Sequence, residues 1–466
     1  MQSLKPKMRL LRPPRFRFFS TDCTAVPLGG TTDYEIETTT LPNNLIVASG
    51  ENGSIISRIS IVYKAGARYE TPDIYGLTHT LSNCTLLSTR NATQFAIRSN
   101  VMQSGANLSC TTTREIVAYT LQGTRKAIEK TLPFLTEVAT MQAFRDYEVR
   151  DNAHCLDAHL ATLPPRERVI EWLHKAAFRK GGLGNSLYIP CHNVGKISVD
   201  DMEAYTSKYF TSGRAAVVAL GVEHDALVKY ASTLQIPKGA GGAPPPSPFK
   251  GGEIRIDERG NRALVGIAIP GPSSADPKTN IAACIVKNVL FGSSRVFRGV
   301  SRSSLLGKAT AGIGAPFQLF PFSEYYSDQG IIGVVVSAPA EAAGQIAEAA
   351  VAAIAADTID EKNFAKMKNE KMLDLASSFE SSNFVFDFIR KTVFGNLGGK
   401  LEDILEVAEA VSVDDANKIL KKAKEGAVSM VAVGDLRNVP YLDELSGLLT
   451  KREKEEVPEI SADDVE

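Results

Sequence analysis

The pattern of apolar and polar positions predicts both strands and helices, in an order that does not alternate regularly. Fully apolar runs and period-two alternation predict strands, whereas apolar residues three or four positions apart predict helices. The strands expected in the first half lie at 34–40, 45–49 and 55–63, within the β-rich stretch 107–121, and at 215–220. The helices expected there are 74–87, 124–141, 145–178 with a break at Pro164-Pro165, one opened by Ser198, and 225–234.

The second half of the chain repeats the order of the first. The helix-opening motif Ser198-Val-Asp-Asp returns as Ser412-Val-Asp-Asp, and the strand 215–221 returns as 428–434, at offsets of 214 and 213 residues. The strand-then-helix pair 115–141 has a counterpart at 330–356. Several matches at one offset indicate a duplication. The predicted fold class is therefore α+β, with two homologous domains of mixed or antiparallel sheet backed by helices.

A Pro- and Gly-rich stretch, PKGAGGAPPPSPFKGG, separates the two halves. Such a composition cannot build a core element, so we expect it to lie extended on the surface as a linker. With 466 residues the chain also exceeds the ~250–300 that one core normally holds. The expected parts are a leader at 1–19, domains at 33–236 and 253–447, the linker at 237–252 and a charged tail at 448–466.

The leader is basic and lacks acids. Six Lys and Arg residues occur between Met1 and Ser20, and the first carboxylate is Asp22. There is no apolar segment of the secretory type, so an Arg-rich, acid-free leader predicts a mitochondrial transit peptide. Arg17-Phe18-Phe19-Ser20 resembles a mitochondrial processing site, with cleavage between Phe19 and Ser20. The alternative is a disordered basic tail.

Composition excludes several functional classes. The net charge of −1 gives no overall positive potential that would attract nucleic acid. No apolar run approaches the ~18 residues that a bilayer span needs. The six cysteines are scattered, with no C-x-x-C pair, which is typical of free thiols in a reducing compartment. No haem or iron–sulfur ligand spacing is present, so no redox cofactor is expected.

The stretch with the most chemical interest is His79-Thr-Leu-Ser82-Asn83. In the inverted zinc motif H-x-x-E-H, two His bind Zn²⁺ from one helix face and the Glu acts as general base. Here the Glu position holds Ser82 and the second His position holds Asn83. Two interpretations follow: a chance His on a helix, or a peptidase scaffold that has lost its chemistry. Both predict no catalytic residue, no metal site and no cofactor.

Two further segments were candidates for chemistry. The third ligand of the inverted motif is expected about 75–80 residues downstream, where the chain offers His154, Cys155, Asp157 and His159. Cys155 and His159 have i, i+4 spacing and could share a metal, but we interpret the thiol as a small buried hydrophobe and the imidazoles as solvated or paired. The Arg- and Ser-rich segment 291–308 lacks the P-loop spacing. It predicts a surface loop, or a contact with an acidic partner or a peptide.

Many blocks of the sequence, taken together and in order, resemble one family. They are similar to the pitrilysin-type peptidases, and more closely to the mitochondrial relatives of these enzymes: the processing peptidase subunits and the core proteins of ubiquinol–cytochrome c reductase (complex III). The likeness runs from about Asp33 to Leu445. Its blocks are 41–49, 64–70, the helix from Gly76, 112–119, 144–149, Leu173-His174, 210–214, 250–255, 326–330 and 440–445.

The resemblance implies a clam-like shell of two homologous domains and a structural, non-catalytic role. It implies pairing with a core protein 1 homologue and other complex III subunits, on the matrix side of the mitochondrial inner membrane, without a transmembrane segment of its own. Active relatives carry the full zinc motif, from which Ser82, Asn83 and the missing downstream Glu depart. A cavity between the domains that binds a presequence without cleaving it stays open.

The sequence leaves two alternative functions open. The first is the α-type, substrate-recognition subunit of the mitochondrial processing peptidase, which carries a glycine-rich loop. The matching segment here, 292–307, is rich in Arg, which suits basic presequences poorly. The second is an active metallopeptidase, which would need zinc held by His79 and by ligands that the sequence does not place.

Overall fold

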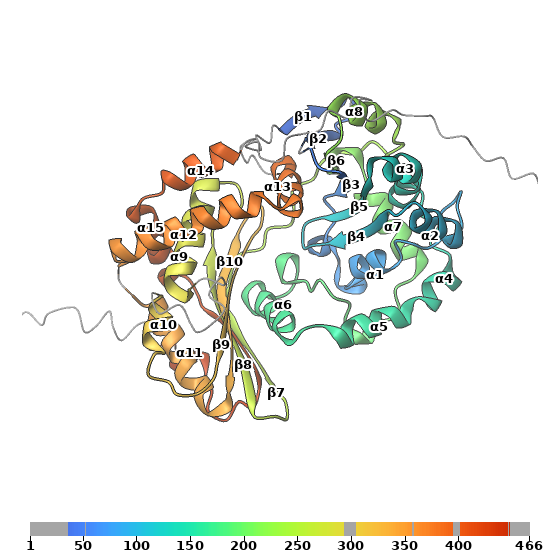
Figure 1. The fold of residues 1–466 in the computed structure, drawn as a ribbon. Helices are drawn as coiled ribbons and strands as arrows, with labels where there is room; N and C mark the ends of the chain where they lie inside the picture. Colours follow the sequence, from blue (N-terminus) through green and yellow to red (C-terminus); the bar gives the residue numbers. More distant parts are fainter. Residues whose placement is uncertain are drawn as a thin grey trace, which may run out of the picture.

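The computed structural model describes residues 36–51, 53–292, 304–356, 358–394, 401–445 and residue 447. Two β-sheets, one from each half of the chain, lie beside one another, each with its own helices (Figure 1). The predicted leader with its Phe19–Ser20 processing site, the charged tail and most of the 291–308 segment lie outside the described residues. None of the helices in the described part combines the length and the apolar character that a bilayer crossing requires.

The N-terminal half contains the first sheet, with the strand order β1-β2-β6-β3-β5-β4. Its neighbours are antiparallel except β2 and β6, which are parallel. The strands are β1 (Ile36–Thr40), β2 (Ile46–Gly50), β3 (Ile56–Tyr63), β4 (Asn107–Thr112), β5 (Val117–Thr124) and β6 (Ala215–Leu220). The helices are α1 (Leu77–Asn83), α2 (Gln94–Gln103), α3 (Arg125–Thr140), α4 (Asp146–Asp151), α5 (Ala153–Thr162), α6 (Pro165–Phe178), α7 (Val199–Tyr209) and α8 (His224–Thr233). Short 3₁₀ turns lie at Ala67–Tyr69, Pro72–Ile74, Gly182–Gly184, Cys191–Asn193 and Ser212–Arg214.

The C-terminal half contains the second sheet, with the order β7-β11-β8-β10-β9. Here β7 and β11 are the parallel pair, and the other neighbours are antiparallel. The strands are β7 (Gly252–Asp257), β8 (Arg262–Gly271), β9 (Gln318–Tyr325), β10 (Gly330–Pro339) and β11 (Ser429–Gly434). The helices are α9 (Pro277–Phe291), α10 (Leu305–Ala309), α11 (Ala340–Ile354), α12 (Glu361–Phe379), α13 (Ser382–Phe394), α14 (Leu401–Glu409) and α15 (Val413–Glu425).

The two sheets have the same topology. Strands β2, β6, β3, β5 and β4 correspond in order and direction to β7, β11, β8, β10 and β9. Each half also has a complete capping box, at Ser198 for α7 and at Ser412 for α15. The α+β fold with two homologous halves is therefore confirmed. Strand β1 is an addition, since β7 has no equivalent neighbour on its outer side in the described part of the chain.

One helix from each half crosses to the sheet of the other. Helix α6 of the N-terminal half packs on the second sheet, where Val169 and Leu173 meet Val335 and Val431. Helix α13 of the C-terminal half packs on the first sheet, where Ile389 lies against β2, β3 and β6. This exchange buries apolar surface from both halves in shared clusters. The two halves are therefore held together by these shared apolar clusters as well as by the chain that connects them.

The stretch that joins the halves is bonded to the N-terminal half at several points. It lacks regular secondary structure, but Ser212 and Gly213 donate backbone hydrogen bonds to the carbonyls of Pro237 and Gly239. Ser247 is only 5% exposed and its hydroxyl accepts from Leu183 N. Most of the stretch is exposed and has no regular secondary structure, as expected of an extended surface linker, and Ser247 and Gly251 are its buried residues.

Helix α1 is shorter than the predicted helix 74–87. It begins after Gly76, whose φ of +90° is a left-handed conformation that favours glycine. It ends at Asn83, and the Thr85 hydroxyl donates to the Ser82 carbonyl at 2.7 Å. A Thr side chain that bonds a preceding carbonyl competes with continued helix. The apolar periodicity of 84–87 therefore belongs to the turn that follows the helix.

Candidate functional site

Helix α1 holds His79 against the 186–191 loop. Leu77 and Leu81 face the first core, which turns His79 away from it toward α5. At Gly76 an added Cβ would lie 2.4 Å from the Cα of Ile189, so only glycine fits there. The close approach brings the backbone of this loop onto the imidazole.

The partner of His79 is His159, from α5. Their Nε2 and Nδ1 atoms lie 2.8 Å apart, and the rings are tilted by 53°. The pairing of these two imidazoles was not predicted, although the spacing of 80 residues carried the signal. His159 lies where the third zinc ligand of the inverted motif is expected. The structure thus brings together two of the predicted candidates and leaves Cys155 out, with its Sγ 3.5 Å from His154 Nε2.

The other nitrogen of His79 accepts a hydrogen bond from the backbone. Ile189 N donates to Nδ1 at 3.2 Å, so the proton of the neutral ring is on Nε2 and points at His159 Nδ1. Burial, and secondarily the neighbouring His159, lowers the pKa of His79 to about 4. The ring is therefore neutral near pH 7, with both nitrogens engaged.

This arrangement does not fit zinc. A zinc-bound His gives one nitrogen lone pair to the metal, while its other ring N–H donates to an acceptor. At His79 the environment is reversed, because the group facing Nδ1 is the donor Ile189 N. To ligate through Nε2, the imidazole would have to direct a protonated Nδ1 at that N–H.

The two altered motif positions form structural hydrogen bonds. Ser82 Oγ donates to the Cys110 carbonyl at 3.2 Å. Asn83 and Asn152 form a reciprocal pair, in which each side-chain amide donates to the other's backbone carbonyl at 3.0 Å. These bonds fix α1 to β4 and to the α4–α5 junction. Neither side chain can act as a carboxylate base.

A buried carboxylate that sequence reasoning missed lies at the start of α1. Glu70 is 6% exposed and accepts from Gly76 N, Thr78 N and Thr78 Oγ1, each at 2.7 Å. Burial raises the pKa of Glu70 to about 7, and the donors from Thr78 and Gly76 offset part of that effect. Glu70 satisfies helix-end N–H groups, a positioning role that its sequence distance from the helix concealed.

His174, on α6, is a buried residue with structural hydrogen bonds. Its Nδ1 donates to the Ile170 carbonyl at 2.7 Å, so its Nε2 accepts from Tyr326 OH at 2.9 Å. Among the residues that the structure describes, no group of three or more His, Cys, Asp or Glu is placed to hold a metal ion.

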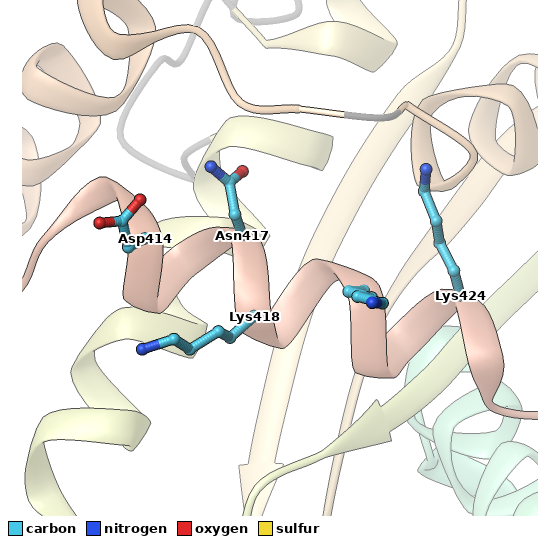
Figure 2. A pocket seen from close by; sticks show the side chains of 5 residues that line it. Asp414, Asn417, Lys418 and Lys424 are labelled. Carbon is cyan, nitrogen blue, oxygen red and sulfur yellow. The ribbon is translucent and has the colours of Figure 1, made fainter.

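One hollow borders this cluster through Tyr188 and Ile189, and a second lies apart from it. The first, about 530 Å³, is bordered by α5, α6 and the 186–191 loop, with Trp172, Arg168 and Tyr188 in its wall. The second, about 440 Å³, lies along α15. Figure 2 shows its polar side chains leaving the helix in different directions, with Lys418 directed away from Asp414 and Asn417. Side chains that diverge in this way do not form a binding site for a small ligand.

Two family models match the chain. Residues 46–191 match the Insulinase (Peptidase family M16) model, and residues 196–371 match the Peptidase M16 inactive domain model. Helix α1 and His159 lie within the first.

Curated relatives match over most of their length. The mitochondrial cytochrome b-c1 complex subunit 2 of Rattus norvegicus is 36% identical over 88% of this chain and 92% of its own. The Homo sapiens protein of the same name is 34% identical over 91% and 95%. A probable mitochondrial-processing peptidase subunit alpha-2 of Arabidopsis thaliana is 23% identical over 88% and 85%. The chain therefore belongs to the family of mitochondrial cytochrome b-c1 complex subunit 2 proteins, within the M16 peptidase group.

Proposed function

We propose that the chain is a non-catalytic core subunit of a mitochondrial cytochrome b-c1 complex (complex III) and supports its assembly and stability. The observation that carries the proposal is the state of His79, whose two nitrogens are engaged by Ile189 N and His159. With Ser82 and Asn83 bonded to backbone carbonyls, the site lacks both a general base and a second ligand. A peptidase of this family needs both.

The arrangement of the halves supports a scaffold role. Arg68 has a fully buried side chain and donates to Glu115 at 2.8 Å and to Asp328 at 2.5 Å, which joins the two halves. Ser327 N and Oγ also donate to Glu115. Charged groups in such a network keep their hydrogen bonds only while the halves stay in register. A fixed shell suits a structural subunit.

The partners follow from the family. Its members are named as mitochondrial subunits of the cytochrome b-c1 complex. We propose other subunits of that complex as partners, including a core protein 1 homologue, on the matrix side of the inner membrane. The domain boundaries 33–236 and 253–447, the leader 1–19, and cleavage between Phe19 and Ser20 are part of the proposal. N-terminal sequencing of the mature protein tests the cleavage site.

Native electrophoresis of mitochondrial membranes, with mass spectrometry of the bands, tests the proposal. The chain is expected to migrate with cytochromes b and c1. The purified protein is expected to hold no stoichiometric zinc and to leave presequence peptides uncut. Migration without cytochromes, together with a partner that has an intact H-x-x-E-H motif and processing activity, would instead support the α subunit of a processing peptidase. That second function is favoured only by the more distant relatives, at 23% identity.

A further inference from the structure

The outer edges of the two sheets differ. Strand β2 is covered by β1, which pairs with it antiparallel from Ile36 opposite Gly50 to Thr40 opposite Ile46. Its counterpart β7 is at the margin of the second sheet and pairs only with β11 in the described part of the chain (Figure 1). The duplicated fold therefore has one occupied and one open copy of the same edge.

The path of the chain explains why β7 stays open. Strand β1 reaches β2 through a tight turn, in which Asn44 has a φ of +64°. The residues before β7 instead cross between the halves, and Lys250 N and Gly251 N both donate to the Ala177 carbonyl. They are fixed to the end of α6 and cannot fold back as a hairpin. A strand on β7 must therefore come from elsewhere.

The backbone groups of β7 that face outward can be assigned. Glu258 N donates to Gly434 O, so residue 258 and the even positions before it face β11. Alternation along a strand then directs the N–H and C=O groups of Glu253, Arg255 and Asp257 outward. An edge of this kind is a template for one further strand, a mode of recognition known as β-augmentation.

The side chains of β7 define the chemistry of such a strand. Ile254 and Ile256 are only partly buried, and with Trp172 they pack at the edge of the apolar cluster under α6. On the other face, Arg255 bonds Glu253 at 3.0 Å and the Val439 carbonyl at 2.8 Å, while Asp257 is exposed. Both oxygens of Glu253 are engaged, by Arg255 and by Leu442 N. An added strand would therefore place apolar residues beside the isoleucines and a basic residue beside Asp257.

We propose that the open edge of β7 binds an extended segment of another subunit of the complex. The segment runs antiparallel to β7, as β1 does to β2, and carries apolar residues at every second position with a basic residue opposite Asp257. The inference rests on the proposed function for the existence of that neighbouring subunit, and on β7 alone for where it binds.

Photo-crosslinking in the assembled complex tests the inference. A benzoylphenylalanine replaces Asp257 in the full chain, mitochondrial membranes are irradiated, and the cross-linked peptides are identified by mass spectrometry. We expect one segment of another subunit, with alternating apolar residues. Co-migration with cytochromes b and c1 is recorded in the same sample.

A pair of variants gives a second measurement. Asp257→Pro removes the outward N–H at the edge without touching the β7–β11 ladder, and Asp257→Ala removes the same side chain but keeps the N–H. We expect Asp257→Pro to weaken retention of the cross-linked subunit by about fivefold to tenfold relative to Asp257→Ala, as the loss of a backbone hydrogen bond predicts.

The outcomes separate the two proposals. Co-migration with the cytochromes, but cross-links only to this chain or to a second copy of it, would overturn the β7 inference and leave the proposed function standing. Equal retention by the two Asp257 variants would do the same. Absence of the chain from the complex would overturn both.

Discussion

The helix that follows the first long strand differs most between the two halves. In the C-terminal half it is α9, 15 residues long, with Ile281, Ile285 and Val289 buried in an aliphatic core. In the N-terminal half it is α1, only 7 residues long, with Thr78 and His79 among its buried residues. The same strand topology therefore accommodates a helix with mainly apolar buried side chains or one with polar buried side chains at this position.

The difference shows how buried polar side chains are accommodated on α1. Each polar group of α1 discussed above has found a structural partner: His79 pairs with His159, Asn83 with Asn152, and Thr78 with Glu70. Buried polar groups cost free energy when they are unpaired, so such pairing makes them tolerable without a metal. The buried polar groups of α1 are therefore expected to make the stability of this region sensitive to pH and to side-chain truncation.

The contacts between the halves should contribute more to the free energy of unfolding than the buried side chains of α1 or α9. Arg68→Met removes the buried guanidinium from Glu115 and Asp328 and should reduce the free energy of unfolding by about 3–5 kcal/mol. Arg125→Met breaks an exposed pair with Glu51 and should cost at most about 1 kcal/mol. Denaturant unfolding measures both. A cost below that of the control for Arg68→Met would mean that the Arg68 network does not hold the halves together.

The pH dependence of stability should be set by two groups around α1 that act in opposite directions. His79 has a pKa lowered to about 4, so its contribution is present above pH 6.5 and lost as pH falls toward 4. Glu70 has a pKa raised to about 7, so its contribution is present below pH 4.5 and lost as pH rises toward 7. Each contribution amounts to about 3 kcal/mol.

Single variants should reveal how each group changes the dependence of stability on pH. Relative to the wild type, His79→Gln should lose less stability between pH 7 and 4, and Glu70→Gln should lose more. Unfolding curves at several pH values measure the slopes. Parallel pH profiles for the two variants would contradict the assignment of opposite signs.

The amide pair at the second motif position should have a smaller effect. Asn83→Ala removes the hydrogen bond from the Asn83 side chain to the Asn152 carbonyl, and only the bond from the Asn152 side chain to the carbonyl of residue 83 remains. We expect a loss of about 1–2 kcal/mol. Asn83→His restores the motif residue but not this bond, and should destabilise similarly without gaining zinc in metal analysis. Stoichiometric zinc in that variant would show that the site is intact apart from one ligand.

The smallest expected effects compare the stability that the capping boxes contribute in the two halves. Ser198→Ala and Ser412→Ala each remove a capping-box hydroxyl and should each cost about 1 kcal/mol. Asp415→Ala should cost slightly more than Asp201→Ala, because Lys278 bonds Asp415 at 2.9 Å and lowers the pKa of that carboxyl. Thermal unfolding of the four variants checks the order. Unequal effects of the two Ser variants would show that the repeat is not equivalent in energy.

The sequence predicted the repeat and the strands well, because period and apolar runs are local signals. The capping boxes at Ser198 and Ser412 and the strands 215–220 and 428–434 are of this kind. Contacts across the chain were harder to predict. The pairing of His79 with His159 depends on α5 passing beside α1, and the crossing of α6 and α13 depends on tertiary packing that no local pattern records. The left-handed Gly76 and the Thr85 hydroxyl explain why α1 is short.

The most direct test of the account is the amount of assembled cytochrome b-c1 complex when the endogenous chain is replaced by a His79→Gln, His159→Gln double variant. Native electrophoresis with a spectroscopic count of cytochromes b and c1 measures it. A scaffold predicts near-normal complex with the variant and loss of the complex when the chain is absent. Normal levels of the variant chain with little assembled complex would contradict a purely structural role for this site.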